Sequence, residues 1–222
     1  MIQLDKVNKR YKINGNSIVG LQDVSIELHG GEFVCLRGPS GSGKTTLLLT
    51  IGGMQRPTSG SVGIADYSDL YALNQSDRTR VRAKHVGFIF QLFHLVPYLN
   101  VLDNIQLGAV SWPNSREESK ELIDKLGLSH RGGHKPSQLS VGECQRVAVA
   151  RALVSRPDVI LADEPTGNLD AANAEIVMHA LAEFCHGGGV LLLATHGEKE
   201  ISRANRQLTI NAGRVTESTE AC

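Results

Sequence analysis

A glycine-rich run that ends in lysine and threonine constrains the fold of this chain more than any other feature. The run consists of Gly38, Pro39, Ser40, Gly41, Ser42, Gly43, Lys44, Thr45 and Thr46. Its first eight residues fit the pattern GxxxxGKS/T, in which glycines allow backbone N–H groups to converge on phosphate oxygens. An apolar segment at 33–36 precedes the run, and helical spacing over 44–51 follows it. Because a helix N-terminus also favours an anion, the run predicts a phosphate-binding loop.

The last residues of the run carry its chemistry. Lys44 is expected to reach the outer phosphates of a nucleotide, and the Thr45 hydroxyl is expected to ligate Mg²⁺. The alternative is a glycine-rich turn with a solvated lysine. A strand before the run and a helix after it are the context of phosphate loops, so they favour the first interpretation.

Two acidic residues follow another apolar segment. Residues 159–162 are apolar and of buried-strand length, and Asp163 and Glu164 come directly after them. Ligands of parallel sheets bind at the carboxyl ends of the strands. Asp163 is therefore expected to hold Mg²⁺ beside Thr45, and Glu164 to polarise a water for attack on a terminal phosphate. A surface turn is the alternative, but the two motifs together indicate a nucleoside triphosphatase or a kinase.

Composition excludes several classes of protein. The 222 residues include 23 Lys and Arg against 23 Asp and Glu, without the basic excess that wrapping nucleic acid requires. Hydrophobic residues make up 41% of the chain, which excludes general disorder. The cysteines, Cys35, Cys144, Cys185 and Cys222, form no CxxC pair, which indicates reduced thiols rather than a zinc site or disulfides. No apolar run approaches the roughly 20 residues of a membrane-spanning helix, so we expect any membrane role to come through a partner.

Strand-like and helix-like segments alternate along the chain, which predicts an α/β fold with a parallel sheet. Expected strands cover 2–7, 24–28, 33–36, 86–90, 159–162 and 190–195, and a hairpin closes around 212–213. Expected helices cover 44–51, 78–84, 116–126, 142–153 and 171–184, and 57–60 is expected to be a loop. Residues from about 66 to 142 are expected to form a helix-rich insertion, and the tail from Ser218 to be loose.

A polar, glycine-containing turn opens the helix expected at 142–153. This signature turn consists of Ser140, Val141, Gly142 and Glu143. It is a second potential anion site, because it too lies at a helix N-terminus. Together with Lys44 and Asp163, the turn closely resembles the signature motif of ABC-type ATPases, and the resemblance extends over almost the whole chain.

The resemblance assigns further residues to the site. Tyr11 matches the aromatic residue that stacks on adenine, and Gln91 matches the glutamine loop that approaches Mg²⁺ and the attacking water. His196 resembles the switch histidine, and 167–170 resembles the D-loop, with Asp170 at the dimer interface. Each residue has a structural alternative, such as packing for Tyr11 and local hydrogen bonding for Gln91 and His196. Asp170 can also cap the helix expected from 171, which does not exclude contact across a dimer.

The resemblance implies a P-loop NTPase fold in a single domain, 1–222. A mostly parallel core sheet would carry an antiparallel β subdomain at the N-terminus and a helical insertion. In this division 1–65 and 143–217 form the nucleotide-binding core, and 66–142 the insertion. The implied catalytic residues are Lys44, Gln91, Glu164 and His196, and the implied metal ligands are Thr45, Gln91 and Asp163. ATP and Mg²⁺ are thus the implied substrate and metal.

The resemblance also implies a dimer of ATPase subunits, expected to be identical. In the family two chains pack head to tail, so that the signature turn of one faces the γ-phosphate of the ATP held by the other. Charge on this phosphate would draw the two chains together, and hydrolysis would remove the attraction. Closing and opening would then drive a membrane partner.

An apolar stretch follows Gln91 and covers 92–97 and 100–105. Core packing explains part of it, and the functional interpretation is a groove near Gln91 to Asn104 where a short helix of a transmembrane permease docks. With 162–170, the stretch is similar to the LolD/MacB-type branch of lipoprotein-releasing and macrolide-export ATPases. The resemblance implies a peripheral subunit on the cytoplasmic side of the inner membrane. It would power export or extraction of a lipoprotein, lipid, peptide or drug.

Two other functions are weighed against transport. A soluble ABC ATPase of DNA repair or translation carries long coiled-coil or zinc insertions or tandem cassettes, and this sequence has one cassette and no heptad stretch. A regulatory module would signal through a membrane partner without moving cargo. Measuring cargo flux in vesicles separates regulation from transport.

The sequence departs from the family pattern at three positions. Val141 replaces the first glycine of the usual signature, and its β-branched side chain disfavours a positive φ. Glu143 replaces the commoner glutamine. Gly197 follows His196 where aspartate is usual, which leaves the stiffness of the switch loop open. Because the principal catalytic residues are all present, we expect turnover to be slow rather than absent.

Overall fold

The computed structural model describes residues 1–13, 15–109 and 115–217, so the tail from Ser218 lies outside the described residues. The larger sheet contains, in spatial order, β5 (Val86–Ile89), β6 (Val159–Asp163), β7 (Val190–Ala194), β3 (Phe33–Arg37), β8 (Arg206–Asn211) and β9 (Arg214–Glu217). The smaller sheet contains β2 (Asn16–Leu28), β1 (Ile2–Ile13) and β4 (Ser59–Ile64). The helices are α1 (Lys44–Ile51), α2 (Gln75–His85), α3 (Val101–Gln106), α4 (Ser115–Lys125), α5 (Val141–Leu153), α6 (Ala171–His186) and α7 (Glu198–Ile201), with short 3-10 helices η1 (Leu107–Ala109) and η2 (Pro136–Gln138).

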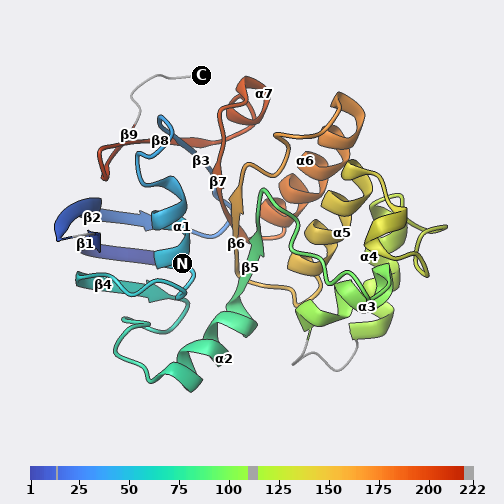
Figure 1. Ribbon diagram of the computed structural model, residues 1–222, viewed down its shortest axis with the longest axis horizontal. Helices are drawn as coiled ribbons and strands as arrows, with labels where there is room; N and C mark the ends of the chain where they lie inside the picture. Colours follow the sequence, from blue (N-terminus) through green and yellow to red (C-terminus); the bar gives the residue numbers. More distant parts are fainter. Residues whose placement is uncertain (14, 110–114, 218–222) are drawn as a thin grey trace.

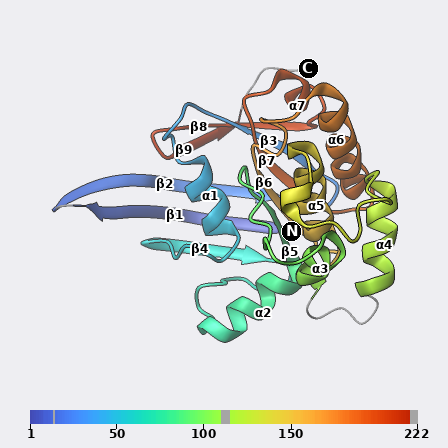
Figure 2. The ribbon, with the colours of Figure 1, turned by 45° about the vertical axis from the view of Figure 1, so that its right-hand side comes forward.

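The larger sheet separates the smaller sheet from a group of helices. In two views, β1, β2 and β4 lie on one side of it and α3 to α6 on the other (Figures 1 and 2). The strands from β5 to β8 run parallel, and only β9 pairs antiparallel, with β8. The smaller sheet is antiparallel throughout. The expected architecture, a mostly parallel core with an N-terminal antiparallel subdomain and helices, is therefore confirmed.

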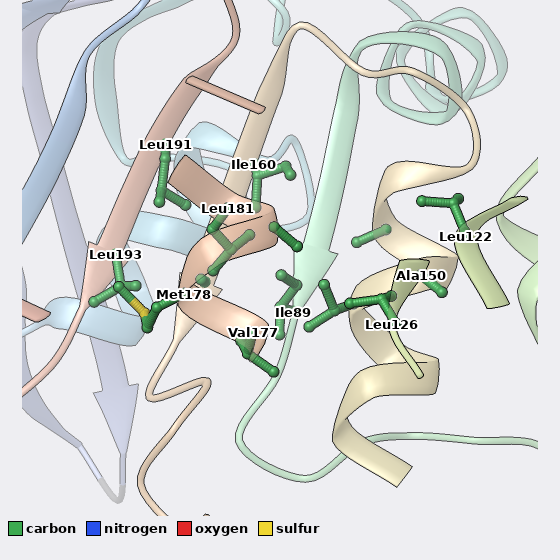
Figure 3. Packing of buried hydrophobic residues seen from close by; sticks show 14 of the residues in the cluster. Ile89, Leu122, Leu126, Ala150, Ile160, Val177, Met178, Leu181, Leu191 and Leu193 are labelled. Carbon is green, nitrogen blue, oxygen red and sulfur yellow. The ribbon is translucent and has the colours of Figure 1, made fainter. Parts of the chain in front are cut away.

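Two hydrophobic clusters cover the two faces of the larger sheet. Because side chains alternate along a strand, Ile160 of β6 belongs to the cluster with α3 to α6, and its neighbour Leu161 to the cluster with α1 and the smaller sheet. In the first cluster Ile160 and Leu191 lie close to Leu181 of α6 (Figure 3). Each such side chain stabilises the fold by about 1.5–3 kcal/mol on full burial. The strands are thus fixed on both faces, which gives the site at their carboxyl ends a rigid base.

The strand β4 differs from the expectation that 57–60 is a loop. Residues from Ser59 onward pair with β1, for example Val62 with Leu4 and Ile64 with Ile2. The segment begins with serine and glycine, which are typical of turns, and its apolar residues come only later. Pairing with β1 therefore decides its structure, and local composition does not.

The insertion expected over 66–142 is rich in helices and contains the strand expected at 86–90. The strand β5 lies inside this range, pairs in parallel with β6 and forms an edge of the larger sheet. The physical reason is that Val86 and Ile89 are buried against the core, which ties this part of the range to the sheet. After β5 the chain forms α3 and α4, which pack on α5.

The described cysteines are buried thiols. Burial raises the pKa of Cys35 to about 12 and that of Cys185 to about 11, so both stay protonated and unreactive. Cys144 is also buried and free, and Cys222 lies outside the described residues.

None of the helices in the described part of the chain combines the length and the apolar character needed to cross a bilayer.

Candidate active site

The phosphate loop, residues 38–45, connects β3 to α1. Gly43 is the N-cap of α1 and has a φ of +114°, a conformation that side chains rarely adopt. A Cβ at this position would overlap the carbonyl oxygen of Gly20. The first N–H groups of α1 have no acceptor within the helix. The Ser42 hydroxyl is buried and has no hydrogen-bond partner among the described residues, which suits a loop that closes around a polar ligand.

The Lys44 ammonium lies inside this loop. It donates hydrogen bonds to the carbonyl oxygens of Gly38 (2.6 Å) and Pro39 (3.1 Å), and its Nζ is 3.2 Å from His196 Nε2. Since lysine has no acceptor, a hydrogen bond between these two side chains requires His196 to accept through Nε2. None of these contacts is to a carboxylate, so they leave the charge of Lys44 available to an anionic ligand.

Thr45 in the first turn of α1 meets Asp163 at the end of β6. The Thr45 hydroxyl donates to Asp163 Oδ2 at 2.7 Å. Within the described residues no group of three His, Cys, Asp or Glu side chains is arranged to hold a metal. Mg²⁺ is usually bound through one or two carboxylates together with substrate phosphates and water. The pair of oxygen donors fits Mg²⁺ bound in that way, rather than a metal held by the protein alone.

Gln91, Glu164 and His196 follow three neighbouring strands, β5, β6 and β7. Gln91 Nε2 donates to Glu164 Oε2 at 3.0 Å, and His196 Nε2 is 3.6 Å from Glu164 Oε1. Glu164 has a φ of +47°, and its N–H donates to the carbonyl oxygen of Ala194 at 2.9 Å. This bond to β7 supports a backbone conformation that is uncommon outside glycine. With its amide nitrogen bonded, Gln91 keeps its carbonyl oxygen for a metal or a water.

Tyr11 borders the same site from β1. Its hydroxyl is 3.1 Å from Thr46 Oγ1. Gly20 on β2 makes room for the ring, because a Cβ there would lie 2.6 Å from Tyr11 Cε2. Sequence reasoning missed Gly20 and the neighbouring Ile18 and Val19, whose apolar side chains are 49% and 37% exposed. The available signal in the sequence was a pair of apolar residues directly before a glycine.

These residues line one cleft of about 330 Å³. Its lining includes Tyr11, Ile18, Val19, Gly20, Ser40, Gly41, Gly43, Lys44, Thr45, Thr46, Gln91, Asp163, Glu164 and His196. Gly38 and Pro39 bind the Lys44 side chain rather than line the cleft, and Ser42 is buried and is not part of the lining. Neither Asp170 nor any residue of the signature turn belongs to the lining.

The signature turn caps α5 with a reciprocal pair of hydrogen bonds. The Ser140 hydroxyl accepts from the Glu143 N–H at 3.2 Å, and Glu143 Oε2 accepts from the Ser140 N–H at 2.8 Å. Arg131 Nε donates to Glu143 Oε1 at 2.7 Å. The Ser140 N–H and, to a lesser extent, Arg131 hold the pKa of Glu143 below its usual value, although burial opposes them. Glu143 therefore stabilises the signature turn through its hydrogen bonds to Ser140 and Arg131.

Val141 is the first residue of α5 and is 50% exposed. It is not among the non-glycine residues with positive φ in the described chain. Position 141 is helical, so the turn does not require the positive φ that a β-branched side chain disfavours. The valine instead adds bulk at the exposed end of the helix.

Asp170 is the N-cap of α6. Its carboxylate accepts from the Asn173 N–H at 2.8 Å and from Asn173 Nδ2 at 2.7 Å, and these bonds lower its pKa. A Cβ at Gly142 would lie 2.6 Å from Asn173 Cγ. Asn173, which sequence reasoning missed, thus joins the signature turn to the D-loop.

The switch loop, residues 195–201, is tied to the segment after Glu164. Gly197 leaves space for the buried Glu200, since a Cβ at 197 would overlap Glu200 Oε2. Glu200 Oε1 accepts from the Thr166 hydroxyl at 2.6 Å, and the Gly197 N–H donates to Thr195 Oγ1 at 2.9 Å. The missing side chain at Gly197 therefore permits the buried hydrogen bond between Glu200 and Thr166.

Replacing Gly197 with alanine is expected to lower the free energy of unfolding by about 1.5–3 kcal/mol, because Glu200 must move and leave Thr166 without its charged partner. Urea unfolding of the variant measures the effect. Gly133→Ala is the matched control, since Gly133 is exposed and a Cβ there has nothing within 4 Å. Equal stabilities of the two variants would show that the Glu200–Thr166 bond does not depend on Gly197.

Comparison with known sequences gives consistent relatives. The ABC transporter family profile matches residues 21–167. The lipoprotein-releasing system ATP-binding protein LolD of Novosphingobium aromaticivorans is 41% identical over 218 residues, which cover 96% of this chain and 97% of LolD. The macrolide export ATP-binding/permease protein MacB of Burkholderia thailandensis is 41% identical over 221 residues, which cover 97% of this chain. The chain spans 33% of the length of that MacB.

Comparison with solved structures identifies a similar dimeric protein. The dimeric structure of MJ0796, a bacterial ABC transporter cassette, has a TM-score of 0.91 and 36% sequence identity. A post-hydrolysis dimer of the same cassette, bound to ADP and Pi, has a TM-score of 0.90 and 34% identity. Both alignments cover 100% of each chain. The resemblance to the LolD/MacB-type branch is confirmed by these sequence relatives, and the resemblance in fold by these structures.

Proposed function

The chain is an ATPase of the ABC transporter family, and we propose that two copies of it pack head to tail around ATP and drive a transmembrane partner. One observation carries the proposal. The phosphate loop, the metal ligands and the catalytic residues line a single cleft, whereas the signature turn lies outside it. The signature turn that contacts ATP in this cleft therefore comes from a second chain. The dimeric structures of MJ0796 support this arrangement.

The phosphate loop binds the triphosphate of ATP, and Tyr11 stacks on the adenine. Lys44 exchanges its bonds to the loop carbonyls for bonds to the outer phosphates, which releases the Nε2 of His196 from its contact with the lysine. Thr45, Asp163 and Gln91 supply the oxygen ligands for Mg²⁺, which neutralises charge that develops on the phosphates. His196 then contacts the γ-phosphate from the switch loop.

Glu164 orients the attacking water and accepts its proton. The water oxygen bonds to the γ-phosphorus, the bond to the bridging oxygen of ADP breaks, and the products are ADP and phosphate. Gln91 holds Glu164 through the 3.0 Å hydrogen bond to Oε2, so the second carboxylate oxygen remains for the water. Gln91 thereby links the catalytic Glu164 to the chain segment that follows Gln91.

A second cleft, of about 380 Å³, supports the proposed docking of a permease beside Gln91. Its apolar lining includes Met54, Phe88, Phe90 and Leu107, and Arg82 and His94 add polar groups. The Arg151 guanidinium donates to the carbonyl oxygens of Phe93 and His94, so the segment after Gln91 is anchored to α5. We infer that a short amphipathic helix of the permease binds here, on the cytoplasmic side of the inner membrane.

The cargo proposed is an amphiphile such as a lipoprotein, lipid, peptide or drug. The names of the relatives support it, because one belongs to a lipoprotein-releasing system and another to macrolide export.

The head-to-tail dimer is tested through Ser140. In the Glu164→Gln background, which should retain ATP, Ser140→Ala is expected to weaken ATP-induced dimerisation at least tenfold, because each site loses a hydrogen bond to a charged phosphate. Sedimentation at increasing ATP–Mg²⁺ concentration measures the dimerisation.

Asn74→Ala is the matched control, since Asn74 caps α2 as Ser140 caps α5 but lies outside the signature turn. Both variants lose a cap of about 1 kcal/mol. Dimerisation that is weakened equally in both, or in neither, would contradict the proposed dimer.

A further inference from the structure

The signature turn carries a negative charge where a phosphate is to be bound. Glu143 lies in the first turn of α5 and is buried, with 8% of its surface exposed. A helix N-terminus favours one anion, and an unneutralised carboxylate there repels a second one. The commoner glutamine at this position would not pose this difficulty. The chain therefore needs a means to remove the effect of the Glu143 charge.

Arg131 is placed to neutralise this charge. Its Nε donates to Glu143 Oε1 at 2.7 Å, while the other carboxylate oxygen is occupied by the Ser140 N–H. The Arg131 backbone is fixed in a turn, because its N–H donates to Leu128 O and its carbonyl accepts from the His134 N–H, both at 2.8 Å. Both oxygens of Glu143 are thus engaged, one by the Ser140 N–H and the other by the Arg131 guanidinium.

We propose that Arg131 is a positioning residue for the contact between the signature turn and the γ-phosphate held by the partner chain. It neutralises Glu143 and keeps the carboxylate folded against Ser140, so that the helix N-terminus presents the Ser140 hydroxyl and the N–H groups of Val141 and Gly142 without a competing negative charge. The inference rests on the proposed head-to-tail dimer. It assigns a role to a residue that lies outside the turn itself.

A double-mutant cycle tests the role of Arg131. In the Glu164→Gln background, Arg131→Met is expected to weaken ATP-induced dimerisation about tenfold when residue 143 is glutamate. In chains that also carry Glu143→Gln, the same change is expected to weaken it less than threefold, because no charge remains to be neutralised. Arg131→Lys retains the charge and should stay within threefold of the parent. Arg80→Met, which removes an exposed arginine paired with Asp77 on α2, is the matched control and should have no effect.

Two measurements separate the possible failures. ATP binding to the single chain, titrated at protein concentrations below dimerisation, should not change in Arg131→Met, because Arg131 lies outside the cleft. If Arg131→Met weakens dimerisation equally in chains with and without the Glu143→Gln change, its role is structural and the inference is wrong, although the dimer stands. If Ser140→Ala leaves ATP-induced dimerisation unchanged, the proposed dimer itself is wrong.

Discussion

Glu164→Gln is expected to lower ATP turnover about 10²–10⁴-fold, the usual contribution of general base catalysis, while ATP binding is retained. Glutamine has nearly the same shape and can still accept the hydrogen bond that Gln91 Nε2 gives to Glu164. It cannot accept the proton of the attacking water, so the chemical step fails although the cleft stays formed. The expected result is a dimer that persists with ATP and releases phosphate slowly.

Phosphate release and sedimentation of the same sample measure the two effects of Glu164→Gln together. Glu175→Gln is the matched control, because Glu175 is paired with Arg203 on the surface. It removes one carboxylate without touching the cleft and should turn over as the parent does. Normal turnover in Glu164→Gln would exclude Glu164 as the base. Loss of ATP binding in that variant would mean that the carboxylate supports the cleft rather than the reaction.

The sequence was most informative where local rules decide the structure. A phosphate loop between a strand and a helix is recognisable because φ > 0 at Gly43 and the free N–H groups of α1 both depend on short-range geometry. The apolar strands at 159–162 and 190–195 were predicted because strands that are buried on both faces of a sheet appear in the sequence as continuous apolar runs. The placement of Asp163 and Glu164 at a strand end follows from these strands.

Other features depend on tertiary contacts that no local pattern contains. Glu200 lies in a four-residue helix, and only the fold brings it to Thr166 and into the space left by Gly197. A comparison with the family pattern at position 197 alone therefore does not reveal this hydrogen bond. In the same way, Gly20 of β2 leaves space for the ring of Tyr11 on the neighbouring strand β1.

Replacing Lys44 with alanine is expected to weaken ATP binding itself by about 10–100-fold, because hydrogen bonds between charged groups contribute about 1.5–3 kcal/mol. Lys44 is 8% exposed, and the described lining of the cleft contains no other lysine or arginine that could replace it. Isothermal titration with ATP and Mg²⁺ measures the affinity directly. Glu164→Gln and Lys44→Ala should thus fail at different steps, the first after binding and the second before it.

Loss of Lys44 also removes its bonds to Gly38 and Pro39, so the folded state must be followed separately. Thermal unfolding without ATP measures this structural effect. The rise of the unfolding temperature on adding ATP then reports binding alone, because a ligand stabilises the folded state according to its concentration relative to Kd. Lys125→Ala, which removes a surface lysine paired with Glu183, should keep the full rise. If Lys44→Ala also kept it, the charge of Lys44 would not contribute to phosphate binding, and the proposed roles of the loop would have to rest on its N–H groups.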